Sequence, residues 1–188
     1  MDSSLAPGLL IAAPPLGDPN FDRSVVLLAA HGSDGAFGWV INGRSVMTVS
    51  ELLVRAGVTK RSLDVPGNVR VGGPVSPEQV WLVYRTEERF AEIEGQFDVG
   101  DEIVATASRR VLEALAEGLA APSLVALAGY AGWAPNQLEE EIRAGAWLPV
   151  ALEPSLLFEG EPSEMWNRAY ATVGATPMSF TSRTVGSA

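Results

Sequence analysis

Two short, uninterrupted apolar runs constrain the fold of this chain more than any other feature. They are Ser24–Ala30 (SVVLLAA) and Ser123–Ala128 (SLVALA). Apolar runs of this length with no polar alternation are typical of strands that are buried on both faces. The chain is therefore expected to build a sheet that is covered on both sides.

The rest of the chain supplies shorter strand and helix signals around these two runs. Further strands are expected at Gly8–Ala13, Phe37–Asn42, Val69–Val71, Val80–Tyr84, Glu102–Thr106 and Trp147–Leu152. Helices are expected to begin at Thr48, Ser108, Pro135 and Pro162. Thr48 and Glu51 match a capping box, in which each side chain satisfies a free backbone N–H of the helix start. This interleaving predicts an α+β fold with a mixed β-sheet covered by helices.

The length of 188 residues favours one domain over residues 1–188, with the chain after about residue 177 loose. Gly, Pro, Asp and Asn residues make the segment Pro14–Asp22 a loop before the first apolar run. HGSDG separates that run from Phe37–Asn42, so these two strands are expected to form a hairpin.

The charge of the chain argues against direct binding to nucleic acid. Thirteen basic and 23 acidic side chains give a formal net charge of −10. DNA-binding proteins gain most of their affinity from Lys and Arg side chains that neutralise phosphates. Lys60 is the only lysine, and the arginines are scattered along the chain. We therefore expect no direct contact with nucleic acid.

Several chemistries are excluded because the residues that they need are missing. The sequence has no cysteine and one histidine, so thiol chemistry and Cys/His metal sites are not expected. It contains no G-x-G-x-x-G or Walker A motif, and we expect no cofactor. No secretion signal and no apolar run of membrane-spanning length is found, which predicts a cytoplasmic protein without a membrane partner.

The loop before the first apolar run carries the first candidate site residues. Asp18 is followed by Pro19-Asn20, which is turn chemistry. Phe21 and Arg23 are not explained by the turn, and could stack on and clamp an anion. In the alternative, Phe21 plugs the end of the sheet and Arg23 pairs with a carboxylate such as Glu141.

His31 also has two interpretations, of which the structural one is preferred. It could act as a general base for Ser24 or Ser33, which would make the chain a hydrolase. Alternatively, it ends a strand and forms hydrogen bonds with the adjacent turn. A general base should lie within about 2.6 to 3.2 Å of the serine hydroxyl, and we expect this geometry to be missing.

Two glycine-marked segments complete the candidates. Gly72 and Gly73 permit either a tight turn or a backbone nest that cradles an anion. The segment Gly129–Trp133 is expected to be a glycine-spaced turn that joins a strand to the helix that bears Gln137 and Glu141. Its aromatic side chains could line a ligand site or belong to the core.

Four ordered blocks resemble the AlgH/YqgE family of bacterial proteins. They are LLIAAPPLGDPNFDRSVVLL, HGSDGAFGWVIN, VGGPVSPE and ALAGYAGWAPNQLEEEIRAGAWL. The resemblance implies an α+β fold with a mixed sheet and a label of transcriptional regulator, but no catalytic residues. This chain has Ala29-Ala30-His31 where members often have Cys-Glu-His. It has Gly43-Arg44 after Ile41-Asn42 where they have Arg-Pro, so any role of that arginine is in doubt.

We therefore expect a non-enzymatic binding or regulatory module that affects gene expression indirectly, through a protein partner or small ligand. The hydrolase is kept as the alternative. The candidate site residues are Asp18, Phe21, Arg23, His31, Asn42, Gly72, Gly73, Tyr130, Trp133, Gln137 and Glu141. The loop at Asp18–Ser24, Gly72–Pro74 and Tyr130–Gln137 are expected to line one common cleft.

Overall fold

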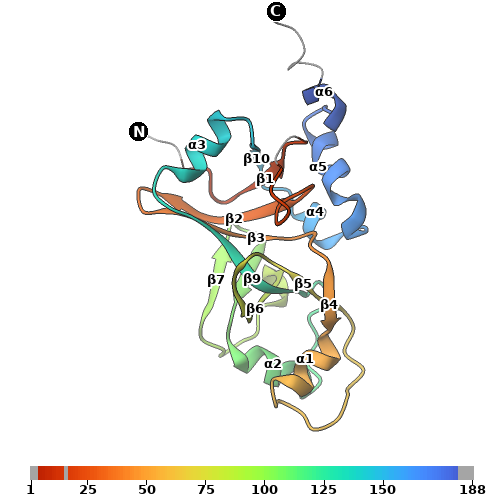
Figure 1. Ribbon diagram of the computed structural model, residues 1–188. Coiled ribbons are helices and arrows are strands. Elements are labelled where there is room, and N and C mark those ends of the chain that lie inside the picture. Colours follow the sequence, from red (N-terminus) through yellow and green to blue (C-terminus); the bar gives the residue numbers. More distant parts are fainter. Residues whose placement is uncertain (1–3, 15–16, 182–188) are drawn as a thin grey trace, which may run out of the picture.

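A computed structural model describes residues 4–14 and 17–181 of the chain (Figure 1). Its strands are β1 Gly8–Ala12, β2 Val25–Gly32, β3 Gly35–Val40, β4 Ser45–Thr48, β5 Asn68–Val71, β6 Val75–Arg85, β7 Gln96–Val99, β8 Ile103–Thr106, β9 Val125–Trp133 and β10 Trp147–Ala151. Its helices are α1 Val49–Arg55, α2 Arg109–Ala116, α3 Gln137–Arg143, α4 Pro154–Phe158, α5 Met165–Thr172 and α6 Pro177–Thr181. Single 3-10 turns lie at Thr86–Glu88 and Pro162–Glu164. The fold is α+β.

The strands form one curled sheet in the order β10-β1-β2-β3-β9-β6-β8-β7, with β4 and β5 attached beside β9. Its pairs are antiparallel except β5 and β9, which run parallel. The sheet is therefore mixed. The hairpin expected from HGSDG is present, because β2 and β3 pair antiparallel with Gly32 opposite Gly35.

β9 is the central strand, because three other strands form hydrogen bonds with it. β6 runs along one edge of β9. On the other edge, β5 pairs with Ala126–Ala128 and β3 pairs with Ala131–Trp133. At the changeover, the Gly72 N–H donates to the Ala128 carbonyl at 2.7 Å, and the Gly72 carbonyl accepts from the Val40 N–H at 2.7 Å. Gly72 therefore lies at the point where β3 replaces β5 as the strand paired with this edge of β9.

Glycines occupy the place where β5 gives way to β3, because the backbone there lies too close to β9 for a side chain to fit. A Cβ atom on Gly72 would lie 2.6 Å from the Gly129 carbonyl oxygen, and one on Gly73 would lie 2.1 Å from that of Tyr130. A Cβ atom on Gly129 would lie 2.4 Å from the Gly73 carbonyl oxygen, and the φ of Gly129 is +74°. Close packing of main chains therefore explains these glycines.

The apolar run of β2 is buried on both faces, as expected. Val25 and Leu27 belong to a core cluster beneath α4 and α5, whereas Val26 and Leu28 belong to a second cluster with α3. All four side chains are 0% exposed. A third cluster, under α1 and α2, receives Ala126 of β9.

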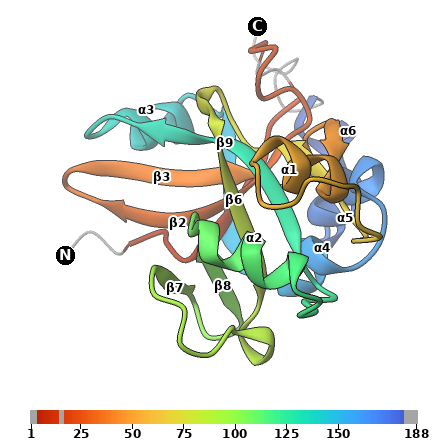
Figure 2. The ribbon, with the colours of Figure 1, turned by 90° about the horizontal axis from the view of Figure 1, so that it is seen from below.

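The helices lie at three corners of the sheet. Seen from below, α1 and α2 lie over β6 and β9, and the β2–β3 hairpin projects away from α4, α5 and α6 (Figure 2). The capping box predicted at the start of α1 is present: Thr48 Oγ1 accepts from the Glu51 N–H, and Glu51 accepts from the Thr48 N–H. Gly57 follows with a φ of +67°, which suits the expected helix stop.

The structure differs from the sequence expectations in three respects. β9 continues through Trp133, so the expected strand-to-helix turn at Gly129–Trp133 is wrong, and the chain turns only at Ala134–Asn136. Strands β4 and β7 and helix α4 were not expected. The chain expected to be loose after residue 177 begins with α6, and residues 182–188 lie outside the described part. None of the helices described is long and apolar enough to cross a membrane.

We expect replacement of Gly129 by alanine to destabilise the protein by about 3 kcal/mol. The new methyl group adds a main-chain clash to the strain of a left-handed backbone. Gly145 is a matched control, since its φ is +79° and a Cβ atom there would meet nothing within 4 Å. Gly145→Ala should therefore lose only about 1 to 2 kcal/mol. Urea unfolding of both variants checks this, and equal losses would contradict the proposed clash.

Candidate functional site

A hollow of about 330 Å³ lies between the loop before β2 and the segment that joins β3 to β4. We call it the Arg23–Arg44 hollow. It is lined by Pro19, Asn20, Asp22, Arg23, Ser24, Val40, Asn42, Gly43, Arg44 and Val71. Arg23 and Asn42, two of the candidate site residues, both line it. Asn20, Asp22 and Arg44 were not among the candidate site residues.

Arg23 is held in an unusual conformation at the wall of this hollow. Its φ of 52° places a non-glycine residue in the left-handed region. The Asn42 side chain fixes the backbone there: its Nδ2 donates to the Arg23 carbonyl at 2.9 Å, and its Oδ1 accepts from the Val25 N–H at 2.8 Å. The Arg23 guanidinium lies over the ring of Trp166, 5.6 Å from the centroid. Arg23 is therefore positioned without a carboxylate.

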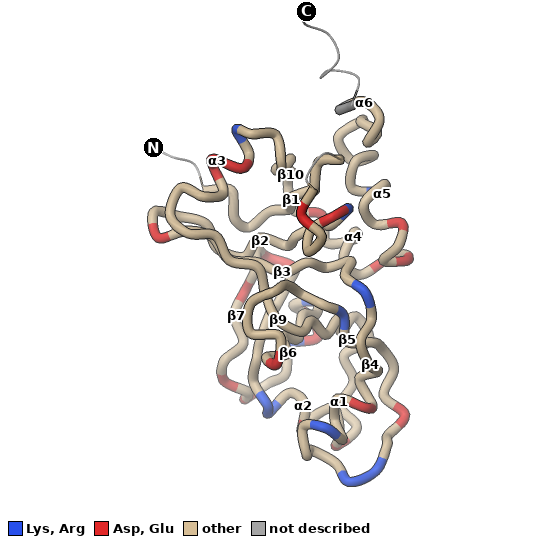
Figure 3. Tube along the Cα trace, viewed as in Figure 1, with Lys and Arg blue, Asp and Glu red and all other residues tan. Residues whose placement is uncertain are grey.

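Arg44 comes to the hollow from the opposite wall. Its side chain is exposed, and its backbone carbonyl accepts from the Val71 N–H at 3.0 Å. Within the described part of the chain, neither Arg23 nor Arg44 forms an ion pair. Figure 3 shows basic residues at the start of β4 and mixed charges in the loop before β2. Two walls of the hollow are therefore lined by arginine residues, of which Arg23 has its guanidinium stacked on Trp166.

The loop before β2 is shaped by local hydrogen bonds. The Asp18 Oδ1 accepts from the Asn20 N–H at 2.8 Å, and the Asp18 carbonyl accepts from the Phe21 N–H at 3.0 Å. Ser24 is buried, and its hydroxyl donates to the Phe21 carbonyl at 2.8 Å. Asp18 therefore serves as a turn former, as its sequence context predicted.

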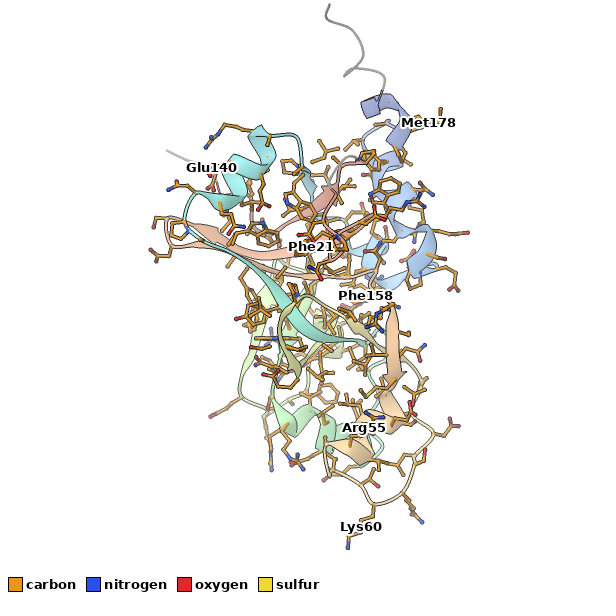
Figure 4. All side chains as sticks on the ribbon, in the orientation of Figure 1. Phe21, Arg55, Lys60, Glu140, Phe158 and Met178 are labelled. Atoms are coloured by element: carbon orange, nitrogen blue, oxygen red, sulfur yellow. The ribbon has the colours of Figure 1, made fainter. Side chains whose placement is uncertain are left out.

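Phe21, which is labelled in Figure 4, packs in an aromatic cluster with the two tryptophans that bind Glu141. Its ring centroid lies 6.3 Å from that of Trp133 and 5.5 Å from that of Trp147. Both indole N–H groups donate to Glu141 Oε2, from Trp133 at 2.9 Å and from Trp147 at 2.8 Å. Gln137 Nε2 donates to the other oxygen of Glu141 at 2.8 Å. This carboxylate ties α3 to β9 and β10.

These contacts decide between two interpretations of the loop. Phe21 does pack at the end of the sheet, which supports the structural role considered for it. The alternative partner of Arg23 is wrong, because Glu141 accepts its hydrogen bonds from the indoles of Trp133 and Trp147 and from Gln137. The hydrogen bonds of Glu141, Trp133 and Gln137 to one another therefore support a structural role for these three residues.

Both ring nitrogens of His31 are occupied by groups other than serine. Nδ1 accepts from the Leu5 N–H at 3.1 Å, so the proton is assigned to Nε2, which lies 2.9 Å from Glu139 Oε1. The ring lies between the segment before β1 and α3, far along β2 from Ser24. The geometry of a general base for Ser24 or Ser33 is therefore missing among the described residues.

The expected single cleft is divided in the structure. The loop at Asp18–Ser24 faces both the Arg23–Arg44 hollow and the Glu141 cluster. Gly72 and Gly73 instead pack in the strand changeover, and Tyr130 packs against Phe37 with ring centroids 4.9 Å apart. Within residues 4–14 and 17–181, no group of three His, Cys, Asp or Glu side chains could hold a metal ion.

Comparisons with known proteins agree on one family. The AlgH-like family model matches residues 9–178. A UPF0301 protein of Anaeromyxobacter sp. strain Fw109-5 is 42% identical over 184 residues, covering 95% of this chain and 92% of that protein. A UPF0301 protein of Idiomarina loihiensis is 36% identical over 174 residues, covering 92% of each.

Solved structures give the same relation. The solution structure of the AlgH protein from Pseudomonas aeruginosa has a TM-score of 0.75 and 30% identity, covering 100% of this chain and 98% of that one. A crystal structure of protein DIP2367 from Corynebacterium diphtheriae has a TM-score of 0.70 and 25% identity, covering 89% and 86%. The structural likeness therefore extends over nearly the whole chain, including the Asp18–Ser24 loop.

Replacing Glu141 with alanine should destabilise the protein by about 3 kcal/mol. The change leaves the indole N–H groups of Trp133 and Trp147 without their acceptor, and these residues are 6% and 4% exposed. Glu140→Ala is the matched control, because Glu140 is exposed on the same helix. Thermal or urea unfolding measures the difference. A Glu141→Ala variant as stable as Glu140→Ala would show that the carboxylate is not an anchor.

The contact between Glu139 and His31 predicts a dependence of stability on pH. The pKa of Glu139 is lowered by a hydrogen bond from its own backbone N–H and, to a smaller extent, by His31. A lowered pKa in the folded state adds stability above the unfolded pKa, and this stability is lost as pH falls through the folded value. The advantage of wild type over Glu139→Gln should therefore shrink between about pH 5 and pH 3. Urea unfolding at each pH tests this, and an advantage that stays constant over this range would contradict the contact.

Proposed function

The chain belongs to the AlgH-like family, and we propose that it is a non-enzymatic binding module whose ligand is a small anion. The ligand would occupy the Arg23–Arg44 hollow. Its bound state would act in the cytoplasm through a protein partner, so that any effect on gene expression is indirect. No cofactor is required by this role.

The observation that carries the proposal is the pair of arginines without carboxylate partners. The chain has a net charge of −10, and Arg85, Arg89, Arg109 and Arg110 form ion pairs. Arg55, Arg61 and Arg143 are exposed and form none among the described residues, so what sets Arg23 and Arg44 apart is that they line the same hollow. Arg23 and Arg44 line one hollow and, among the described residues, form no ion pair. A guanidinium group binds carboxylate and phosphate with matching geometry. An anion between the two walls would supply the missing counter-charge.

The backbone of Arg23 supports a functional role for this side chain. A non-glycine residue in the left-handed region costs of order 1 to 2 kcal/mol. Such strain persists where the surroundings impose it, and it is concentrated at functional sites. Here the Asn42 side chain holds the Arg23 backbone, and the guanidinium rests on Trp166, which lines a neighbouring hollow together with Arg23.

The size of the hollow restricts the ligand. Sites for small molecules have volumes of about 300 to 1,000 Å³, and 330 Å³ lies at the lower end of that range. A small metabolite fits this volume, whereas a dinucleotide does not. The hydrolase alternative lacks support, because the ring nitrogens of His31 contact Leu5 and Glu139.

Inorganic phosphate is the simplest probe of the proposal. We expect it to bind saturably to wild type in calorimetry. Trp166 lies beneath Arg23, so the total fluorescence of the five tryptophans should also change. Arg44→Gln should weaken binding by about tenfold, because a charge-assisted contact is lost. Arg44 is chosen because it is exposed, so its replacement should leave the fold intact.

Arg143→Gln is the charge-matched control for this experiment. Arg143 is exposed at the end of α3, away from the hollow. Phosphate binding should be unchanged in this variant if the site is local. Equal weakening in both variants would indicate a general charge effect, and no binding to wild type would reject the anion site.

A further inference from the structure

The Arg23–Arg44 hollow also contains a free carboxylate. Asp22 lines it and is exposed, and its side chain forms no hydrogen bond or ion pair within the described part of the chain. A purely anionic ligand would meet a like charge at this position. From this carboxylate we infer that the ligand is a small zwitterion, with an ammonium group for Asp22 and an anionic group for the arginines. The inference rests on the proposed function.

The neighbouring residues do not neutralise Asp22. Arg23 follows it directly, but the Arg23 guanidinium lies over Trp166 and forms no ion pair with a described carboxylate. The Arg44 guanidinium, on the opposite wall, forms none either. Asp22 therefore keeps its charge available to a ligand.

Two of the uncharged polar side chains of the hollow already have hydrogen-bond partners within the protein. The Asn42 side chain is already used to bridge Arg23 and Val25. The Ser24 hydroxyl donates to the Phe21 carbonyl. The side chain of Asn20 is exposed beside Asp22 and can accept from an ammonium group. One wall thus offers Asp22, Asn20 and Arg23, whereas the other offers Arg44 as its charged group.

This arrangement and the volume of about 330 Å³ define a ligand class. The ligand would carry one ammonium and one phosphate or carboxylate, separated by a short spacer. Phosphorylated amines and amino acids share this chemistry. Opposite charges on the ligand also make electrostatic complementarity specific, since molecules that carry only one of the two groups leave Asp22 or the arginines unpaired.

Matched pairs of probes test the ammonium directly. We would compare phosphoethanolamine with ethyl phosphate, and β-alanine with propionate, by calorimetry and by tryptophan fluorescence. In each pair the spacer and the anion are kept while the amine is removed. Wild type should bind the amine-bearing member about tenfold more tightly, which corresponds to about 1.4 kcal/mol. The pair with the higher affinity identifies phosphate or carboxylate as the preferred anion.

Asp22→Asn should abolish this preference and leave ethyl phosphate bound at least as tightly as before, because a like charge is removed. Asp34→Asn is the matched control, since Asp34 is an exposed aspartate in the turn between β2 and β3. The control variant should keep the tenfold preference. Circular dichroism and urea unfolding of both variants would verify that each is folded.

The outcomes separate this inference from the proposed function. Equal affinity for both members of each pair in wild type, or a preference that survives Asp22→Asn, would overturn the zwitterion while leaving the anion site standing. Loss of phosphate binding in wild type, or binding that is insensitive to Arg44→Gln, would instead reject the anion site itself. A preference that is present in wild type and Asp34→Asn and absent in Asp22→Asn supports the inference.

Discussion

The arrangement of this fold depends on the hydrogen bonds along one edge of β9, which two strands, β5 and β3, share. A strand has two edges for hydrogen bonds, and β9 gives one to β6 and divides the other between β5 and β3. The division requires the backbones at Gly72, Gly73 and Gly129 to touch without side chains. Because β3 leads into Asn42 and Arg44, this contact also fixes one wall of the Arg23–Arg44 hollow. The candidate site is therefore positioned by main-chain packing at the centre of the sheet.

Local signals in the sequence predicted most of the elements, but not the path of β9. The double burial of β2 and the capping box at Thr48 depend on neighbouring residues, and both are confirmed. Gly129 was interpreted as the start of a turn, because glycine is common there. Its actual role depends on the Gly73 carbonyl, which lies 56 positions away in the chain and is invisible to a local pattern.

The same limit applied to the candidate site. Phe21 and Arg23 were identified because turn chemistry did not explain them, and they lie on opposite sides of one loop. Arg44 was placed in doubt by its shifted position, yet it faces Arg23 across the hollow. The signal that could have identified it was the lack of an acidic neighbour in the surrounding sequence. Pairing of β4 with β5, which was not expected, brings it there.

The Asp18–Ser24 loop has two sides with different chemistry. On one side, Glu141 accepts three hydrogen bonds, from two indoles and an amide, and its acceptor capacity is largely used. On the other side, Asp22, Arg23 and Arg44 keep their charges without ion-pair partners among the described residues. The satisfied anchor holds the backbone of the loop in place, and this fixes the position from which Asp22 and Arg23 reach the hollow.

The burial of β2 on both faces has a consequence for strand alignment. In a sheet with one wet face, a slip by one residue would expose apolar side chains, so hydrophobicity fixes the alignment. Val25–Leu28 are apolar at every position, so a slipped β2 would still be buried. Alignment is then set by the turn of the β2–β3 hairpin and, at the other end of β2, by Asn42, which accepts from the Val25 N–H and donates to the Arg23 carbonyl. The Asn42 side chain, at the hollow, thus helps to fix the register of β2.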